Sequence, residues 1–286
     1  MKTFPSILNF TLACVLAGYS CSSAKNAQRS KDKDFVDAQY EVTWNFTFMK
    51  DTISMTKGNV DRYILLIGEN YTYADGYLRY KSDSLQGHPE AFLEEFKKGT
   101  SSGLITHVLM ATKLYKDFTK KKLSVIDHIS VNFFIYEEPL IPQNWKVQDD
   151  TMTIAGYSCQ KALCDWRGRS YIAWFTAEIP LDEGPWKFFG LPGLIVKIYD
   201  TRHHYDFELV AFKKTDRKID LRPLLTKRDS KGSWNYKLQP IERKEFLAMK
   251  FGIKGYLTAK ADMAKVGLSA ADWIEIYHDY IELDYK

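Results

Sequence analysis

The side chains best suited to metal chemistry are His203 and His204, which are adjacent in the sequence and have Asp200 and Asp206 close by. Imidazole and carboxylate groups are common zinc ligands, but a zinc site also needs a third ligand and hydrogen-bonded support for its histidines. Neighbouring residues of a strand point to opposite faces, and at the tip of a turn both point to solvent. The spacing therefore favours an exposed turn, and we expect no metal and no cofactor.

Three acidic residues, Glu178, Asp182 and Glu183, are close enough in the chain to suggest paired-carboxylate chemistry. Such a pair acts as acid and base only where burial or mutual repulsion shifts its pKa values. Acidic residues beside an apolar loop are more often solvated, which is the interpretation we favour. Arg167 and Arg169 flank a turn, and their guanidinium groups suit a phosphate or carboxylate, although arginines at a turn are commonly just solvated.

The sequence lacks the short motifs of common catalytic sites, such as a Gly-x-Ser-x-Gly turn, a His-Glu-x-x-His helix, a phosphate-binding loop or a dinucleotide fingerprint. The chain has six histidines, and none stands beside a candidate nucleophile. We therefore expect a protein that is not an enzyme. The formal net charge of +4, with a single basic run at 120–122, gives no indication of nucleic-acid binding.

An apolar loop is predicted at residues 184–195. Its glycines and prolines exclude a regular helix or central strand before Leu194, yet it is rich in aromatic rings. Such a loop either folds onto the core or presents a surface to a ligand or partner. The candidate binding residues are those of the loop and of the strand and turn before it, namely Trp174, Trp186, Phe188, Phe189, Leu191, Arg167 and Arg169.

A tight hairpin is predicted to position this loop, with strands at 159–166 and 169–176 and a turn in which Gly168 supplies a positive φ. This register pairs Leu163 with Ile172 and Lys161 with Trp174 across the strands. The predicted core face consists of Cys159, Leu163, Ile172 and Trp174.

Two cysteines, Cys159 and Cys164, remain in the body of the chain. Five residues apart on one strand, they lie on opposite faces and roughly 16 Å apart. A disulfide requires Cα atoms within about 7 Å. We therefore expect two small buried hydrophobic side chains rather than a disulfide.

Strand-like patterns dominate the chain, most clearly at residues 39–48, where every second side chain is apolar. Helices are expected only at 88–99, at 240–251 and from 269 through 276.

The expected fold class is mainly β (β-rich α+β), a strongly curved antiparallel sheet, half-barrel-like, with a few capping helices. One domain is predicted over residues 37–286, with a mixed carboxyl part at about 214–286. Aromatic side chains can line the concave face of such a sheet.

Residues 1–24 are typical of a signal peptide, because the apolar stretch at 7–18 is too short to span a bilayer. Two ends of this segment remain open, cleavage near Ala24 and lipid attachment at Cys21, which follows a weak lipobox. Residues 25–36 are then a flexible tether. The sequence predicts an exported protein that lies in the periplasm or is associated with the outer membrane. If Cys21 is lipidated, the lipid anchors the protein to the membrane.

The loop carries a recognisable motif, Gly190, Leu191, Pro192, Gly193, Leu194 and Ile195. With it, the chain resembles the GLPGLI family of exported Bacteroidota proteins, most densely from about Trp145 to Asp200. The molecular activity of that family is uncharacterised, so the resemblance implies export and no catalytic residues. Further matching stretches are Gly156–Ala162, Arg167–Arg169, Ala173–Thr176, Glu178–Pro180 and the closing Tyr280–Leu283.

Together these observations predict a non-enzymatic cell-envelope protein that binds an apolar small molecule, a lipid or a protein partner through its curved sheet and aromatic loop. The alternative is an interaction or structural subunit of an outer-membrane complex, in which the loop is buried as a fold lock. Burial of the loop side chains distinguishes the two. A metal-dependent hydrolase that uses His203 or His204 is the least favoured hypothesis.

Overall fold

The computed structural model describes residues 34–51, 56–57, 60–77, 80, 112–129, 132–225, 238–251 and 280–284. Several predicted features lie outside these residues, namely the signal peptide with Cys21, residues 25–33 of the tether, and the helices expected at 88–99 and 269–276. Among the described residues, no helix is both long enough and apolar enough to cross a membrane.

The described strands belong to one fourteen-stranded sheet. They are β1 (Phe35–Asp51), β2 (Thr56–Lys57), β3 (Asp61–Gly68), β4 (Tyr71–Gly76), β5 (Lys113–Asp117), β6 (Lys122–Ile129), β7 (Asn132–Pro139), β8 (Lys146–Ile154), β9 (Tyr157–Trp166), β10 (Arg169–Thr176), β11 (Leu194–Asp200), β12 (Tyr205–Lys214), β13 (Lys218–Asp220) and β14 (Gln239–Pro240). The described helices are α4 (Arg222–Leu225) and α5 (Arg243–Phe251).

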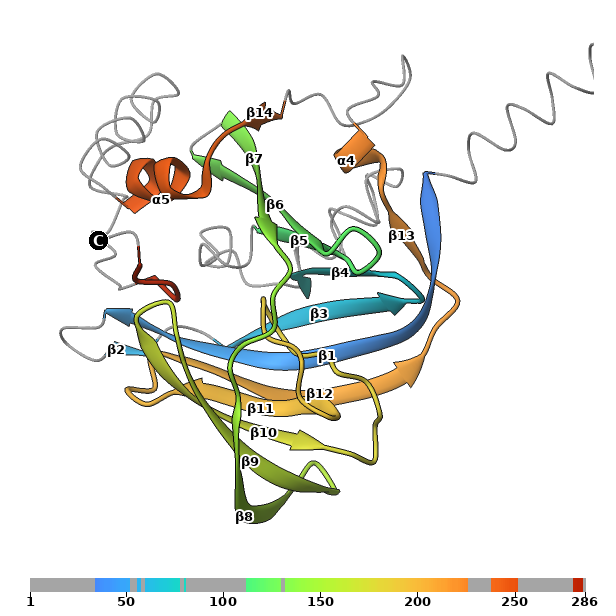
Figure 1. The fold of residues 1–286 in the computed structure, drawn as a ribbon, viewed down its shortest axis with the longest axis vertical. Helices are drawn as coiled ribbons and strands as arrows, with labels where there is room; N and C mark the ends of the chain where they lie inside the picture. The colour runs from blue at the N-terminus through green and yellow to red at the C-terminus, as the bar shows by residue number, and fades with distance from the viewer. Residues whose placement is uncertain are drawn as a thin grey trace, which may run out of the picture.

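The order of strands is β14-β7-β6-β5-β4-β3-β1-β12-β11-β10-β9-β8, with β13 and β2 attached to β1. The described pairs are antiparallel except for β14 with β7, which is parallel. The sheet is open, with β14 and β8 at its two edges, and it curves strongly (Figure 1). The predicted fold class is confirmed.

The long strand β1 forms the middle of the sheet and shows the alternation that the sequence predicts. Val42, Trp44 and Phe46 are fully buried on one face, because a strand with period-two apolar residues buries one side. The Trp44 indole donates to the Ile195 carbonyl oxygen at 3.0 Å, which links β1 to β11 on this face. β1 begins at Phe35, two residues before the predicted start of the domain.

Buried apolar side chains lie on both faces of the sheet. The larger cluster includes the buried apolar residues of the 177–193 loop, and we call the face that it covers the inner face. A smaller cluster, with Ile64, Leu66 and Tyr115, packs on the other face of β3 to β6. Figure 1 shows the turn of the β9–β10 hairpin beside the short segment 280–284.

The predicted hairpin register is confirmed, since Leu163 pairs with Ile172 and Lys161 with Trp174. The predicted core face is wrong at three of its four positions. Leu163, Ile172 and Trp174 are only half-buried, whereas the alternate residues Ala162, Cys164, Tyr171, Ala173 and Phe175 are buried in the core.

The reason for this error is that both faces of the hairpin carry large apolar side chains, so size does not reveal which face is buried. Trp174 lies with its ring 6.0 Å from the Lys161 ammonium group. Cys159 and Cys164 are free and buried, as expected.

Truncation of two adjacent residues of β10 should therefore cause very different losses of stability. Phe175→Ala removes a ring that is 2% exposed, and we expect a loss of about 3–5 kcal/mol of unfolding free energy. Trp174→Ala removes a half-buried ring, and we expect a loss of only about 1–2 kcal/mol. Urea unfolding of the two variants measures this difference, and a larger loss for Trp174→Ala would contradict the assignment of faces.

Candidate functional site

The loop at residues 177–193 joins β10 to β11 and folds back on itself. A bridge pairs Glu183 with Phe189. The Gly190 amide donates to the Asp182 carbonyl oxygen at 2.8 Å. The loop is therefore held by its own backbone hydrogen bonds, which suits a fixed shape.

The end of the loop passes very close to the end of β10. Gly193 has a φ of 149°, and a Cβ atom at this position would lie 2.1 Å from the Thr176 carbonyl oxygen. The Leu194 amide, next in the chain, donates to the Ile179 carbonyl oxygen at 3.0 Å. Only glycine fits here, because it lacks a Cβ atom and tolerates positive φ.

The large apolar side chains of the loop are buried. Trp186 and Phe188 have no exposed surface, and Leu191 and Phe189 keep 1% and 6%. The Phe188 ring meets the Tyr171 ring edge-on at 4.7 Å. These side chains close the core, as the fold-lock alternative expects, and have no open face for a ligand.

The backbone of the loop is also bound from outside it. The side-chain amide of Gln143 donates to the Lys187 carbonyl oxygen at 3.2 Å and its oxygen accepts from the Phe189 amide at 3.0 Å. The Trp145 indole donates to the Phe189 carbonyl oxygen at 2.9 Å. Satisfied backbone groups stabilise a buried loop, since unpaired ones are costly.

Lys187 is the one charged residue in the apolar centre of the loop. Its Nζ lies 2.6 Å from Glu138 Oε2 on β7 and 2.7 Å from Glu282 Oε1. The neighbouring Trp186 indole donates to Glu282 at 3.2 Å. The loop therefore connects β7 to the segment 280–284.

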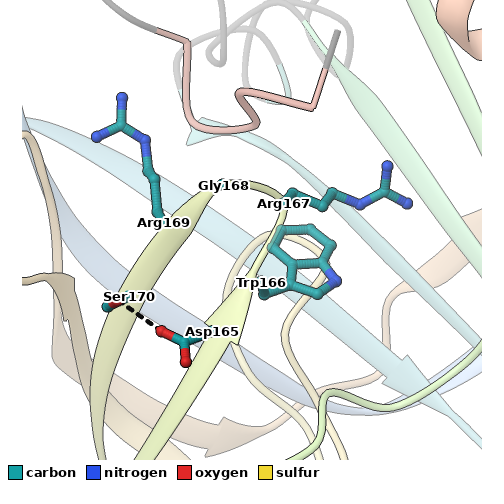
Figure 2. A pocket seen from close by; sticks show the side chains of 6 residues that line it. All are labelled: Asp165, Trp166, Arg167, Gly168, Arg169 and Ser170. Atoms are coloured by element: carbon teal, nitrogen blue, oxygen red, sulfur yellow. Dashed lines mark hydrogen bonds between the residues drawn. The ribbon is translucent and has the colours of Figure 1, made fainter.

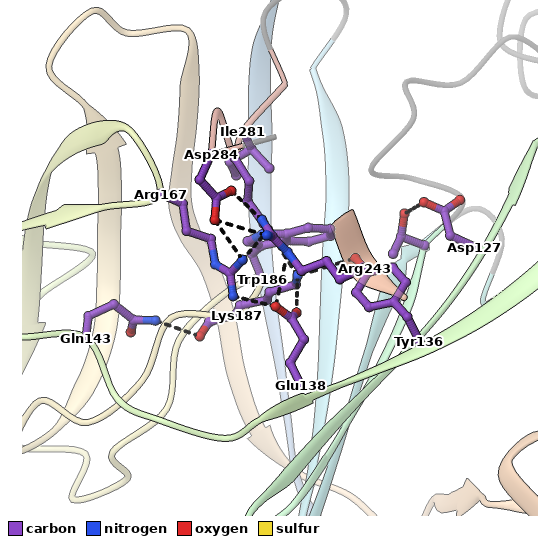
Figure 3. Close-up of polar contacts among 12 residues, drawn as sticks. Asp127, Tyr136, Glu138, Gln143, Arg167, Trp186, Lys187, Arg243, Ile281 and Asp284 are labelled. Carbon is purple, nitrogen blue, oxygen red and sulfur yellow. Dashed lines mark hydrogen bonds and ion pairs between the residues drawn. The ribbon is translucent and has the colours of Figure 1, made fainter. Parts of the chain in front are cut away.

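Two arginines bridge the same carboxylates. Arg243 Nε, at the start of α5, lies 3.1 Å from Glu138 and 3.0 Å from Glu282. Arg167, in the hairpin turn, contacts Glu138, Glu282 and, at 3.3 Å, Asp284. Figure 3 shows the two arginines between Glu138 and Asp284, with Lys187 close to them. We call the following six residues the ion cluster: Glu138, Arg167, Lys187, Arg243, Glu282 and Asp284.

The ion cluster balances three cations against three carboxylates. Burial by itself raises the pKa of Glu282, but the charges of Lys187, Arg167 and Arg243 outweigh this effect and lower the pKa to about 2. Glu282 is therefore ionised at neutral pH and has no proton to donate. Within the ion cluster, this carboxylate joins the loop, the hairpin turn and α5 to the segment 280–284.

A second buried pair lies at the other side of the loop. Lys116 on β5 and Glu183 are 2.5 Å apart, and both side chains are almost fully buried. Burial raises the pKa of Glu183, and the Lys116 charge opposes that rise. The expectation that Glu183 is solvated is wrong, whereas Glu178 and Asp182 are exposed as predicted.

Arg169 is buried beside the turn that follows β11. Its guanidinium group lies 3.1 Å from Asp200 and 3.1 Å from His204 Nδ1, and it donates to the Tyr280 carbonyl oxygen at 2.8 Å. His203 is exposed, as predicted, but His204 is buried. Within the part of the chain that the structure describes, no His, Cys, Asp and Glu side chains gather to hold a metal ion.

A depression of about 250 Å³ lies at the tip of the β9–β10 hairpin, lined by residues 165–170. Figure 2 shows Arg167 and Arg169 leaving the tip on opposite sides. The segment 280–284 passes close to this tip, since a Cβ atom on Gly168 would lie 2.9 Å from Leu283 Cβ. Both arginines thus bind groups of their own chain.

Comparison with known protein families finds a match over the loop and the strand before it. The model of a family described as a protein of unknown function (Porph_ging) matches residues 166–197, from the hairpin turn to the start of β11. This is the GLPGLI family, so the resemblance seen in the sequence is confirmed over that stretch. No curated protein matches the chain.

Among solved structures, the fold is similar to that of PNGF-II. A PNGF-II structure in a P21 space group has a TM-score of 0.50 at 15% identity. The match covers 75% of this chain and 34% of the PNGF-II chain. A PNGF-II structure in a C2 space group has a TM-score of 0.46 at 16% identity, and the match covers 80% of this chain and 33% of the PNGF-II chain. The chain thus spans about a third of those chains, and the likeness concerns the fold alone.

Sequence reasoning missed most of the ion cluster. Of its residues, only Arg167 was a candidate. Glu138 and Arg243 belong to no motif, and Glu282 lies in the closing stretch Tyr280–Leu283, which was noted for its resemblance to the family but was given no role. One signal was present, since Lys187 is a charge among aromatic residues that needs a buried partner.

Two glycines with positive φ allow a matched test of the loop. Gly193→Ala places a Cβ atom against the Thr176 carbonyl oxygen, and we expect a loss of at least about 3 kcal/mol of unfolding free energy. Gly156→Ala meets no atom within 4 Å, so only the backbone strain of about 1–2 kcal/mol remains. Urea unfolding distinguishes the two, and equal losses would contradict the close approach.

Removing the buried carboxylate of the ion cluster should destabilise the fold strongly. Glu282→Gln leaves its cations incompletely paired, and we expect a loss of about 3–5 kcal/mol in unfolding free energy at pH 7. The control is Glu137→Gln, which breaks an exposed pair with Lys122 and should cost less than about 1 kcal/mol.

The same pair of proteins gives a pH dependence with a definite sign. The pKa of Glu282 is lowered on folding from 4.5 to about 2, so its contribution is complete above pH 4.5 and is lost as the pH falls through 2. The stability difference between the wild type and Glu282→Gln should therefore shrink as the pH falls from about 5 to about 2. A constant difference in urea unfolding over that range would contradict the lowered pKa.

Proposed function

We propose that this chain is an exported, non-enzymatic cell-envelope protein that serves as an interaction or structural subunit, with its aromatic loop buried as a fold lock. The observation that carries the proposal is the burial of Trp186, Phe188, Phe189 and Leu191. A loop that binds a ligand must keep part of its apolar surface accessible, whereas the rings of this loop are buried and its backbone is bound by Gln143 and Trp145.

The charges near the loop support a role without catalysis. Lys187 and Glu282 compensate each other within the ion cluster, and Lys116 compensates Glu183. An acid or base catalyst needs a group with a pKa near the working pH and access to a substrate. In the described residues these buried charges instead join segments of the chain to one another.

The edge strand β8 supports a protein partner. Among the strands that the structure describes it pairs only with β9, and nearly all of its residues are exposed. Val147 and Met152 on this strand are 46% and 45% exposed. An exposed edge strand offers unpaired backbone groups to a strand of another protein, and apolar side chains add contact area.

The proposal places the protein in the periplasm or at the outer membrane, where it contacts the membrane only through its signal or a lipid on Cys21. No nucleic acid is expected as a partner. The alternative, an apolar small molecule or lipid held by the sheet and loop, requires a surface other than the buried rings of residues 186–191.

A charge placed on the edge strand tests the partner hypothesis. Val147→Lys should reduce by at least about tenfold the share of the protein that is isolated with a partner from solubilised envelopes, because a buried charge opposes strand pairing. Val210→Lys is the control, since Val210 on β12 is 44% exposed. Native mass spectrometry of the wild type and both variants measures the share of complex.

Equal shares of complex in the two variants would contradict a role for β8. The same spectra test the alternative ligand. The proposal expects the mass of the mature chain, with or without an acyl group on Cys21. A stoichiometric lipid or small molecule that is released on denaturation would contradict the proposal and favour the apolar-ligand hypothesis.

A further inference from the structure

The segment Tyr280–Asp284 is bound to the rest of the chain in the way that a protein binds a peptide. Its backbone is recognised along its length. The Tyr280 carbonyl oxygen accepts from Arg169 at 2.8 Å, the Ile281 carbonyl oxygen accepts from the Tyr171 hydroxyl at 2.7 Å, and the Leu283 amide donates to the Arg167 carbonyl oxygen at 2.7 Å.

The side chains of this segment occupy two kinds of surroundings. Tyr280 and Ile281 are fully buried among apolar groups, and the Tyr280 ring stacks on Phe251 at 4.3 Å and meets Trp186 edge-on at 6.3 Å. Glu282 and Asp284 instead meet the cations of the ion cluster. The site therefore binds an aromatic and an aliphatic side chain, followed by two acidic side chains that are separated by one residue.

The charge of the receiving site favours an acidic occupant. Without the segment, Lys187, Arg167 and Arg243 would face the single carboxylate of Glu138. Three cations around one carboxylate leave an excess of positive charge in a largely buried place, which is costly until further carboxylates enter. Glu282 and Asp284 supply those carboxylates from one short stretch.

The groups that recognise the segment come from β10, the hairpin turn, the loop and α5. A separate peptide of the same sequence would meet the same hydrogen-bond donors and cations. We infer that this groove is a binding site for an acidic peptide segment with the pattern aromatic–aliphatic–Glu–x–Asp, and that residues 280–284 are its resident occupant, which a partner's segment replaces.

This inference rests on the proposed interaction role and names the class of partner segment. It predicts competition, because a resident occupant lowers the apparent affinity of any peptide that needs the same groove. Weakening the hold of the resident should therefore expose the site to a peptide added from outside.

The test uses the full chain carrying Glu282→Gln and a labelled peptide with the sequence of residues 279–286. The peptide should bind this variant at least about tenfold more tightly than it binds the wild type and should raise its melting temperature by several degrees. A control peptide with glutamine in place of its glutamate should do neither, because it cannot restore the missing carboxylate. Fluorescence anisotropy and thermal unfolding give the two readouts.

A milder variant covers the case in which Glu282→Gln does not fold. Asp284 keeps 38% of its side chain exposed, so Asp284→Asn should retain the fold and increase the affinity for the peptide by about fivefold. Adding Arg243→Gln to either variant should abolish the gain, since Arg243 belongs to the receiving site.

Equal binding of the glutamate and glutamine peptides, or equal affinities of the wild type and the folded variants, would overturn the inference. The measurement needs only the purified chain and peptides, whereas the edge-strand test needs the envelope partner. Failure of the peptide-binding test would therefore exclude the acidic-peptide site, whereas failure of the edge-strand test would exclude the role of β8.

Discussion

The carboxylate of Glu282 is completely buried, and the compensation of its charge is the constraint on which the inner side of the sheet depends. A carboxylate removed from water is unfavourable unless cations surround it closely. Here they come from the loop, the hairpin turn and α5, as Lys187, Arg167 and Arg243. Each of these elements must be in place before the charge is satisfied, so electrostatics fixes contacts that local propensity does not.

The same place joins the ionic and the apolar parts of the core. Trp186 and Lys187 are adjacent in the loop, and both reach Glu282, one through its indole and the other through its ammonium group. One residue later, Phe188 packs against the hairpin ring of Tyr171. The prolines restrict the loop before it folds, which lowers the entropy lost when these contacts form, whereas its glycines increase that loss. The loop thereby joins the hairpin to the segment 280–284.

The local sequence pattern was enough to predict the strands and their pairing, but not the residues of the ion cluster. Alternation in β1 and the turn at Gly168 specify strand pairing within short stretches, so the register of Leu163 with Ile172 could be predicted. The buried face could not, because both faces of the hairpin carry apolar residues and the larger Trp174 lies on the outer one. The partners of Lys187 were hidden for another reason, since contact between residues so far apart follows only from the completed fold.

The stretch matched by the family model lacks the carboxylates that pair with its own buried cations. Residues 166–197 contain Arg167 and Lys187, but the carboxylates of Glu138 and Glu282 that pair with both cations lie outside. Buried cations are costly without such partners, so the loop in this form depends on acids supplied by β7 and by the segment 280–284. The motif by itself therefore does not determine how the loop is placed.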